Sequence, residues 1–512
     1  MEKNKKLIVL GVLALILIVS GITYAILTWT SSKINIGLTS NCFTIDYTKG
    51  NDIANASIKA LNESDLISDN KFTIKEGIAL TYANIGIKST CTIEGYGSLY
   101  LNVTTLSSAF STGNSKGALK YAVLDNTSTT STVTVASLLN QQFNIVSKGS
   151  ITSTGKITLL TKQLSNTKLN KYLIVIYADV SKIANDAMDA SFNGTVSADA
   201  NQGEYIPAKE TLKVLNLSLS SGTPNFTKTS IDDKTNGIYS AKDDLGTSYY
   251  FRGNVTNNYV KFANKYWRII RINGDGTIRM IYAGTSAHAN GYDDFSANDM
   301  SIGTSAFNSS YNDNTYVGYM HGTAGASTYA NTHSNTTNST IKIKLDSWYD
   351  TNIVNTGNEK YIADAIYCND RSVSSGTGIG TIATTYAAQT RINNGKPTLK
   401  CTNNNDKFTK STTIGNGKLT RMIGLITSDE VMYAGGTVST NTEYYLYSGK
   451  YYWTMAPYSF ASGNARVGSV NDIGHLSNSY VSYTDAVRPV VSLKSDAISG
   501  GSGTAASPFL VG

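Results

Sequence analysis

The chain has 512 residues, of which 41% are hydrophobic and only 15% charged, so it is neither a disordered acidic chain nor a coiled coil. At about 150 residues per domain, a chain of this length is expected to form two to four domains. The formal net charge is +7, and Lys3, Lys5 and Lys6 contribute to it from the first six residues. Over the rest of the chain the charge is too dilute for the clustered basic face that binds nucleic acid, so no nucleic-acid partner is expected.

Residues 7–29 contain no charged side chain and follow a cluster of lysines. As a helix they would reach about 35 Å, enough to cross a bilayer core of about 30 Å. The lysines predict a cytoplasmic N-terminus and export of everything after residue 30. Thr23 and Ala25 also place small residues as a signal-peptide cleavage site after Ala25 requires. Residues 1–30 are therefore expected to be a membrane anchor helix or a signal peptide, and the protein to be a single-pass cell-surface protein or a secreted one.

Four cysteines fit an exported chain: Cys42, Cys91, Cys368 and Cys401. They allow three pairings. If the two halves of the chain fold separately, only Cys42–Cys91 and Cys368–Cys401 are local pairs. Four free thiols are the alternative. No CxxC motif is present, so neither a structural zinc site nor a redox site is expected.

Residues 31–200 predict a β-sandwich. Apolar and polar residues alternate over 99–104, 132–135 and 192–198, as in half-buried strands. Residues 173–177 form a continuous apolar run, which is typical of a strand covered on both faces. One helix is expected near 53–66. Residues 201–234 contain turn-forming sequences and are expected to be a linker.

Residues 235–512 predict an α+β domain. Two β-type runs, 267–272 and 277–282, flank an NGDG turn and predict a hairpin. Helices are expected at 339–353 and at 428–434, where Thr427 and Glu430 have the spacing of a capping box. Further strands are expected at 452–456 and 487–493, and long surface loops at 302–340 and 372–392.

Several short motifs resemble a known exported family. Residues 21–28 (GITYAILT), 84–86 (NIG) and 192–196 (FNGTV) resemble the TasA/camelysin-like biofilm-matrix family of Gram-positive bacteria. In that family the usual aromatics follow the signal, where this chain has Ile26 and Leu27. The resemblance implies a jelly-roll-like β-sandwich that can assemble into fibres by strand donation.

The second half carries a separate resemblance, spread over five motifs in one order. They are residues 267–272 (WRIIRI), 424–427 (GLIT), 452–457 (YWTMAP), 487–491 (VRPVV) and 501–509 (GSGTAASPF). They resemble segments of exported bacterial surface proteins, and the hairpin and late strand also resemble the C-type-lectin-like fold of the formylglycine-generating-enzyme group. That fold serves binding in some members and catalysis in others. The enzymes need reactive cysteines, whereas Cys368 and Cys401 are spaced as a structural pair, so the resemblance favours binding.

Catalytic and metal-binding motifs are not found in the sequence. The four histidines show neither HxxxH nor HxH spacing, and no P-loop or GxGxxG occurs. The GxSxG string at 113–117 lies in a polar stretch and is interpreted as a turn. Acidic pairs at 232–233, 243–244 and 293–294 would suit calcium, but no EF-hand loop is present. No catalytic residue, metal ion or cofactor is therefore expected.

Tyrosine is abundant, with 33 residues against 13 phenylalanines. Aromatic rings can stack on sugars, and the densest cluster gives the candidate ligand surface: Tyr445, Tyr447, Tyr451, Trp453 and Tyr458. The alternative is that tyrosine simply suits β-sheet surfaces. Arg268, Arg271 and Arg279 are expected on solvated strand faces.

These features lead to three functional hypotheses. The first is a bacterial cell-surface binding or adhesion protein, with a β-sandwich stalk and a recognition head for a glycan or a surface protein. The second is a secreted biofilm-matrix or fibre subunit that self-assembles. The third is an exported modifying enzyme, which only the fold-level resemblance supports, so the chain is not expected to be an enzyme.

Overall fold

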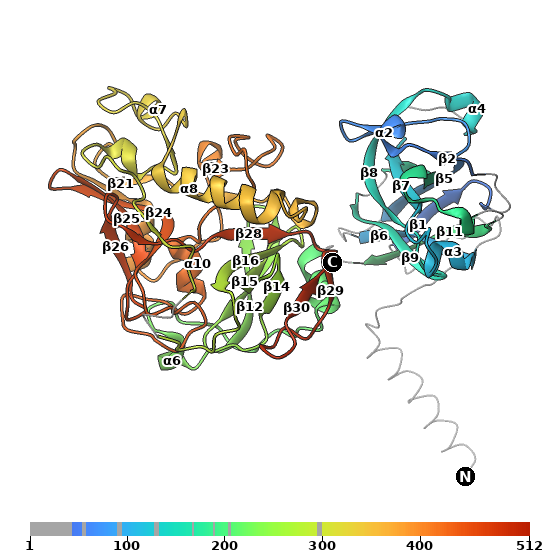
Figure 1. Ribbon diagram of the computed structural model, residues 1–512. Coiled ribbons are helices and arrows are strands. Elements are labelled where there is room, and N and C mark those ends of the chain that lie inside the picture. The colour runs from blue at the N-terminus through green and yellow to red at the C-terminus, as the bar shows by residue number, and fades with distance from the viewer. Residues whose placement is uncertain are drawn as a thin grey trace, which may run out of the picture. The chain divides into compact units, whose positions relative to one another are not determined.

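The computed structural model describes residues 43–53, 58–89, 95–126, 133–165, 168–187, 190–202, 206–293 and 299–512 (Figure 1). With 38% strand and 16% helix, the protein is mainly β, as the sequence predicts. The chain divides into two compact units at Tyr205/Ile206. The expected anchor or signal segment, the cleavage site at Ala25, and Cys42 and Cys91 lie outside the described residues. Within the described ranges, no helix is both long and apolar enough to cross a membrane.

The described residues of the first unit form two sheets. The larger has eight strands, in the order β1-β5-β10-β7-β8-β4-β3, with β2 paired to β10. The smaller has the order β11-β6-β9. The bounds are β1 (Phe43–Lys49), β2 (Ala60–Leu61), β3 (Ile67–Ser68), β4 (Lys71–Thr73), β5 (Ala79–Ser89), β6 (Gly95–Leu106), β7 (Leu119–Asp125), β8 (Gln142–Ser150), β9 (Gly155–Leu164), β10 (Asn170–Asp179) and β11 (Phe192–Gln202).

The strand patterns explain how these sheets pack. On β6, Leu99, Leu101 and Val103 point to one face and enter a core that also holds Ile174 and Ile176 of β10. The intervening residues of β10, including Leu173 and Val175, enter a second core on the opposite face of the larger sheet. The prediction that 173–177 is a strand covered on both faces is therefore confirmed, as are the strands at 99–104 and 192–198.

Two local predictions in this unit are wrong. Of the helix expected over 53–66, the described residues form only α2 (Glu63–Leu66), and Ile53 bridges to Gly194. The strand expected at 132–135 does not form over its described residues, 133–135, where the chain enters α4 (Val135–Leu138). The side chain of Thr134 accepts a hydrogen bond from the backbone N–H of Ser137, and this cap favours a helical turn over continued alternation. A further short helix is α3 (Ser108–Ser111).

The second unit begins earlier than expected, so residues 206–234 are not a linker. Helix α5 (Pro207–Val214) buries Ala208 and Leu212 in the core of this unit. The hydroxyl of Thr211 donates to the carbonyl oxygen of Gly276 at 2.8 Å. Helix α6 (Ser230–Asp233) follows, with Thr229 as its cap.

The core of the second unit is built from two larger sheets. One has eight strands, in the order β12-β13-β15-β14-β30-β29, with β16 joining β15 to β28. The other has seven, in the order β17-β27-β24-β22-β21, with β25 and β26 continuing from β24. The bounds are β12 (Gly237–Asp243), β13 (Gly246–Arg252), β14 (Tyr259–Phe262), β15 (Lys265–Ile272), β16 (Ile278–Gly284), β17 (Thr304–Ser305), β21 (Val373–Ser375), β22 (Thr384–Tyr386), β24 (Tyr452–Ala461), β25 (Asn464–Val470), β26 (Leu476–Tyr480), β27 (Asp485–Ala486), β28 (Val490–Leu493), β29 (Ile498–Gly500) and β30 (Phe509–Val511).

Most of the predicted elements in this unit are confirmed. Strands β15 and β16 form the hairpin around the NGDG turn, where Gly276 has a φ of +89°. Helix α8 (Thr340–Tyr349) is capped by Ser339, and α10 (Ser428–Tyr433) has the capping box of Thr427 and Glu430. The expected loop at 372–392 instead holds β21, β22 and the start of α9 (Ala387–Asn393). The stretch 302–340 contains short pieces, namely β17, β18 (Met320–His321), α7 (Tyr329–Thr332) and β19 (Thr337–Asn338).

Candidate functional site

The second unit has a recess lined by charged side chains beside the disulfide, here called the charged recess. Its cavity volume is only about 40 Å³. Its charged lining comprises Asp243, Asp244, Arg271, Arg279, Asp370, Arg391, Lys400, Asp429 and Glu430.

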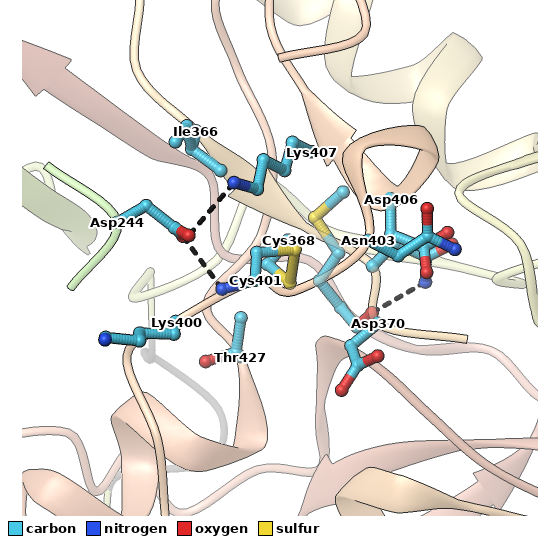
Figure 2. Close-up of a disulfide and its surroundings, with 12 residues drawn as sticks. Asp244, Ile366, Cys368, Asp370, Lys400, Cys401, Asn403, Asp406, Lys407 and Thr427 are labelled. Atoms are coloured by element: carbon cyan, nitrogen blue, oxygen red, sulfur yellow. Dashed lines mark hydrogen bonds and ion pairs between the residues drawn. A yellow bond between two sulfur atoms is a disulfide. The ribbon is translucent and has the colours of Figure 1, made fainter. Parts of the chain in front are cut away.

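The predicted Cys368–Cys401 disulfide is confirmed, and Figure 2 shows its surroundings. It joins β20 (Tyr367–Cys368) to a loop 33 residues later in the chain. The backbone N–H of Cys401 donates to Asp244 at 2.8 Å, and Lys407 lies 3.0 Å from the same carboxylate. Lys407 belongs to β23 (Lys407–Phe408), which pairs with β20. Asp244 therefore ties the β12–β13 turn to both sides of the cross-link.

Glu430 lies at the buried centre of the charged recess and is shared by two arginines. Its carboxylate lies 2.9 Å from Arg271 Nε and 2.6 Å from Arg279 Nε. Arg271 also contacts Asp243 at 2.7 Å. Burial raises the pKa of Glu430, but Arg279 and Arg271 outweigh it and hold the pKa below its ordinary value. The expectation that Arg268, Arg271 and Arg279 are solvated is wrong, since all three are buried.

A second ion-pair group lines the same recess. The guanidinium of Arg391 on α9 donates two hydrogen bonds to Asp429, at 2.7 and 2.8 Å, and one to Asp370 at 2.8 Å. Every carboxylate that lines the charged recess is thus held by a cation of the protein. The side-chain oxygen of Asn273 has no hydrogen-bond partner in the described part of the chain, but it is a single neutral acceptor. Apart from Lys400, whose ammonium group forms no ion pair within the described residues, these charges hold elements together and are not left for a ligand.

The five residues of the predicted ligand surface do not form one exposed surface. Tyr445 and Trp453 are 1% and 0% exposed, and Tyr447 is also buried. Trp453 is buried because β24 is a central strand with both faces covered. Its indole N–H donates to the carbonyl oxygen of Ser305. Tyr458 is partly buried, whereas Tyr451, just before β24, is 44% exposed. The prediction is therefore wrong for Tyr445, Tyr447 and Trp453 as contact residues.

Tyr451 instead lines a second recess, here called the tyrosine groove. The groove has a volume of about 480 Å³ and is open to solvent. Its lining comes from the residue just before β24, from β25 and β26, from the turn after β26 and from β27. The lining residues are Tyr451, Arg466, Ser477, Asn478, Ser479, Tyr480, Tyr483 and Asp485.

The aromatic side chains of the tyrosine groove are positioned by their neighbours. The rings of Tyr480 and Tyr483 are 5.0 Å apart at an interplanar angle of 80°. The guanidinium of Arg466 lies 4.8 Å from the centre of the Tyr480 ring and donates to its hydroxyl at 3.2 Å. Tyr483 remains 55% exposed. The groove therefore presents held aromatic rings, two of which, Tyr451 and Tyr483, are open to solvent.

Two polar atoms of the tyrosine groove have no partner. Asp485 is only 9% exposed, and its Oδ2 makes no hydrogen bond within the described residues. Arg466 Nε, on the neighbouring lining, is likewise unpartnered there. Burial raises the pKa of Asp485 above its ordinary value, and a hydrogen bond from Ser479 only partly offsets this effect. Because an unpaired buried polar group costs free energy, these two atoms need partners that the described residues do not supply.

The sequence contained a signal for this groove that the prediction overlooked. Residues 480–485 (YVSYTD) place two tyrosines and an aspartate within six positions. Their importance depends on Tyr451 and Arg466, which only the pairing of β25 with β24 and β26 brings close.

The GxSxG string and the first acidic pair make contacts that stabilise the fold. Ser115 of the GxSxG string lies in a turn and bonds to Asp186 at 2.6 Å. Asp233 of the first acidic pair contacts Arg252 at 3.2 Å. In the ranges that the structure describes, no three histidine, cysteine or acidic side chains gather as a metal site would require.

No protein-family model, no curated protein and no solved structure matches the chain. The resemblances to the TasA/camelysin-like family and to C-type-lectin-like domains therefore remain predictions.

Proposed function

We propose that the protein is a bacterial cell-surface binding protein whose second unit recognises a glycan through the tyrosine groove. The observation that carries this proposal is the combination of exposed tyrosine rings with unpartnered polar atoms in one groove. In this proposal the first unit is a β-sandwich stalk and the second a C-type-lectin-like head.

The chemistry of the tyrosine groove suits a sugar. The exposed rings of Tyr451 and Tyr483 offer apolar faces on which the C–H face of a sugar ring can stack. Asp485 and Arg466 supply an unpaired acceptor and an unpaired donor, which hydroxyl groups can satisfy.

A binding role is favoured over a catalytic one because the carboxylates of the charged recess already form ion pairs. A general acid or base needs a group free to exchange a proton with substrate. The carboxylates of the charged recess are instead engaged by arginine and lysine side chains.

The proposed location follows from the sequence. Residues 7–29 would either hold the protein in the membrane or direct its secretion, with release after Ala25. The disulfide is consistent with an oxidising compartment outside the cytoplasm.

The proposal is tested by binding of the full exported chain to a panel of cell-wall and matrix polysaccharides, measured by isothermal titration calorimetry. We expect at least one glycan to bind, and Tyr483→Ala to weaken that binding by about tenfold or more, since a contact ring contributes at least about 1.4 kcal/mol.

Tyr311→Ala is the matched control, because Tyr311 is 45% exposed but does not line the groove. The Tyr311→Ala variant should bind the glycan with the affinity of the wild type. Binding that is unchanged by Tyr483→Ala, or no binding to any glycan of the panel, would refute the proposal.

A further inference from the structure

We infer that the tyrosine groove selects a sugar that carries a free, positively charged amino group. This inference rests on the proposed glycan-binding function and specifies its ligand class. It comes from the charges that line the groove and from the partners they lack.

The first argument is that Asp485 has no cationic partner and that its Oδ2 has no hydrogen-bond partner within the described residues. Its short strand, β27, lies between β17 and β24, and Asp485 is paired across the sheet with Ser305. This position removes the carboxylate from water, yet no lysine, arginine or histidine of the described chain forms an ion pair with it. A carboxylate that has lost its water without gaining a cation is stabilised most by a cationic ligand group.

The second argument is that Arg466 does not neutralise Asp485. Its guanidinium lies over the Tyr480 ring and donates to the Tyr480 hydroxyl. The remaining Nε–H has no acceptor in the described residues. An amino sugar offers both complements in one molecule, an ammonium group for Asp485 and a hydroxyl or ring oxygen for Arg466 Nε.

The third argument concerns the tyrosine rings. Aromatic faces attract cations as well as the C–H groups of sugars. The open rings of Tyr451 and Tyr483 therefore favour a protonated amino sugar over a neutral one, and over a sugar that carries a carboxylate. The first and third arguments point to the same charge on the ligand, and the second adds a place for one of its oxygens.

The experiment compares two probes of equal length, a glucosamine tetramer and an N-acetylglucosamine tetramer, with the full exported chain. Titration calorimetry at about pH 6 keeps the amine protonated. We expect the glucosamine tetramer to bind at least about tenfold more tightly, as an additional charged hydrogen bond predicts. Asp485→Asn should abolish this preference, and Tyr483→Ala should weaken both tetramers.

Asp472→Asn is the control for removal of a carboxylate, because Asp472 is exposed and lies outside the groove lining. It should keep the preference. Equal or tighter binding of the acetylated tetramer to the wild type would overturn this inference and leave the glycan-binding proposal standing. Failure of every glycan in the wider panel would overturn both. Since the decisive comparison uses the wild-type protein, it does not depend on whether Asp485→Asn folds.

Discussion

At the scale of single residues, the interior of the second unit contains several fully buried arginine side chains. Arg252, Arg268, Arg279, Arg371 and Arg488 are among its largest fully buried side chains. The sequence predicted exposed arginines because charged side chains usually lie at the surface. What could not be read from the sequence is the partner, since Arg271 and Glu430 are separated by 159 positions.

His333 is a buried residue whose titration should be measurable. Its Nε2–H donates to the carbonyl oxygen of Gly378 at 3.0 Å, and burial, reinforced by Arg371, lowers its pKa to about 3. The unfolded chain binds this proton near pH 6.5. The second unit should therefore lose stability as the pH falls from 6.5 towards 3, by up to about 1.4 kcal/mol per pH unit from this histidine.

The check is urea unfolding of the wild type and of His333→Gln over this pH range. Glutamine can keep a donor for Gly378 but cannot take up the proton, so the variant should show the shallower slope. Other groups titrate equally in both proteins, so the difference isolates His333. Parallel slopes would contradict the prediction.

At the scale of elements, local pattern succeeded where a strand or helix has a strong signal of its own. Strand β10, the β15–β16 hairpin and helix α10 were predicted from an apolar run, a turn and a capping box. Strands β21 and β22 were missed because they have only three residues each and depend on pairing with one another and with β24. Such pairing is set by the tertiary fold and leaves little trace in the local sequence.

Helix α10 and the β15–β16 hairpin are joined through Glu430. Glu430 accepts the N-terminal hydrogen bond from Thr427 N–H and also contacts Arg271 and Arg279. Glu430→Gln removes the carboxylate charge that Arg271 and Arg279 share. We therefore expect the free energy of unfolding to fall by about 3–5 kcal/mol.

Urea unfolding followed by circular dichroism measures this loss. Glu443→Gln is the control, because Glu443 is exposed and its loss should change stability by less than about 0.5 kcal/mol. A loss for Glu430→Gln as small as that of the control would show that the ion pairs are not required.

For the whole molecule, the sequence predicted two folded parts but drew the boundary of the second too late. Residues 206–234 look like a linker because turn-forming residues are frequent there. The short helix α5 has too little periodic signal to reveal its role, yet Leu212 and Leu215 enter the core. Asp233, near the end of the same stretch, pairs with the buried Arg252.

This boundary is tested with two fragments. A fragment of residues 206–512 keeps α5 and Asp233 and should unfold cooperatively. A fragment of residues 235–512 exposes the surface that Leu212 and Leu215 cover and leaves Arg252 without its carboxylate. We expect the shorter fragment to be less stable by at least about 3 kcal/mol or to aggregate. Equal unfolding midpoints in urea would show that residues 206–234 are a linker after all.

The most direct test of the central claim is a crystal structure of the protein with a bound glucosamine oligosaccharide. The account predicts a sugar ring stacked on Tyr483 or Tyr451 in the tyrosine groove, with its amino group at the carboxylate of Asp485 and an oxygen at Arg466 Nε. A sugar bound elsewhere, or a groove left empty at a concentration that saturates binding in solution, would contradict the account.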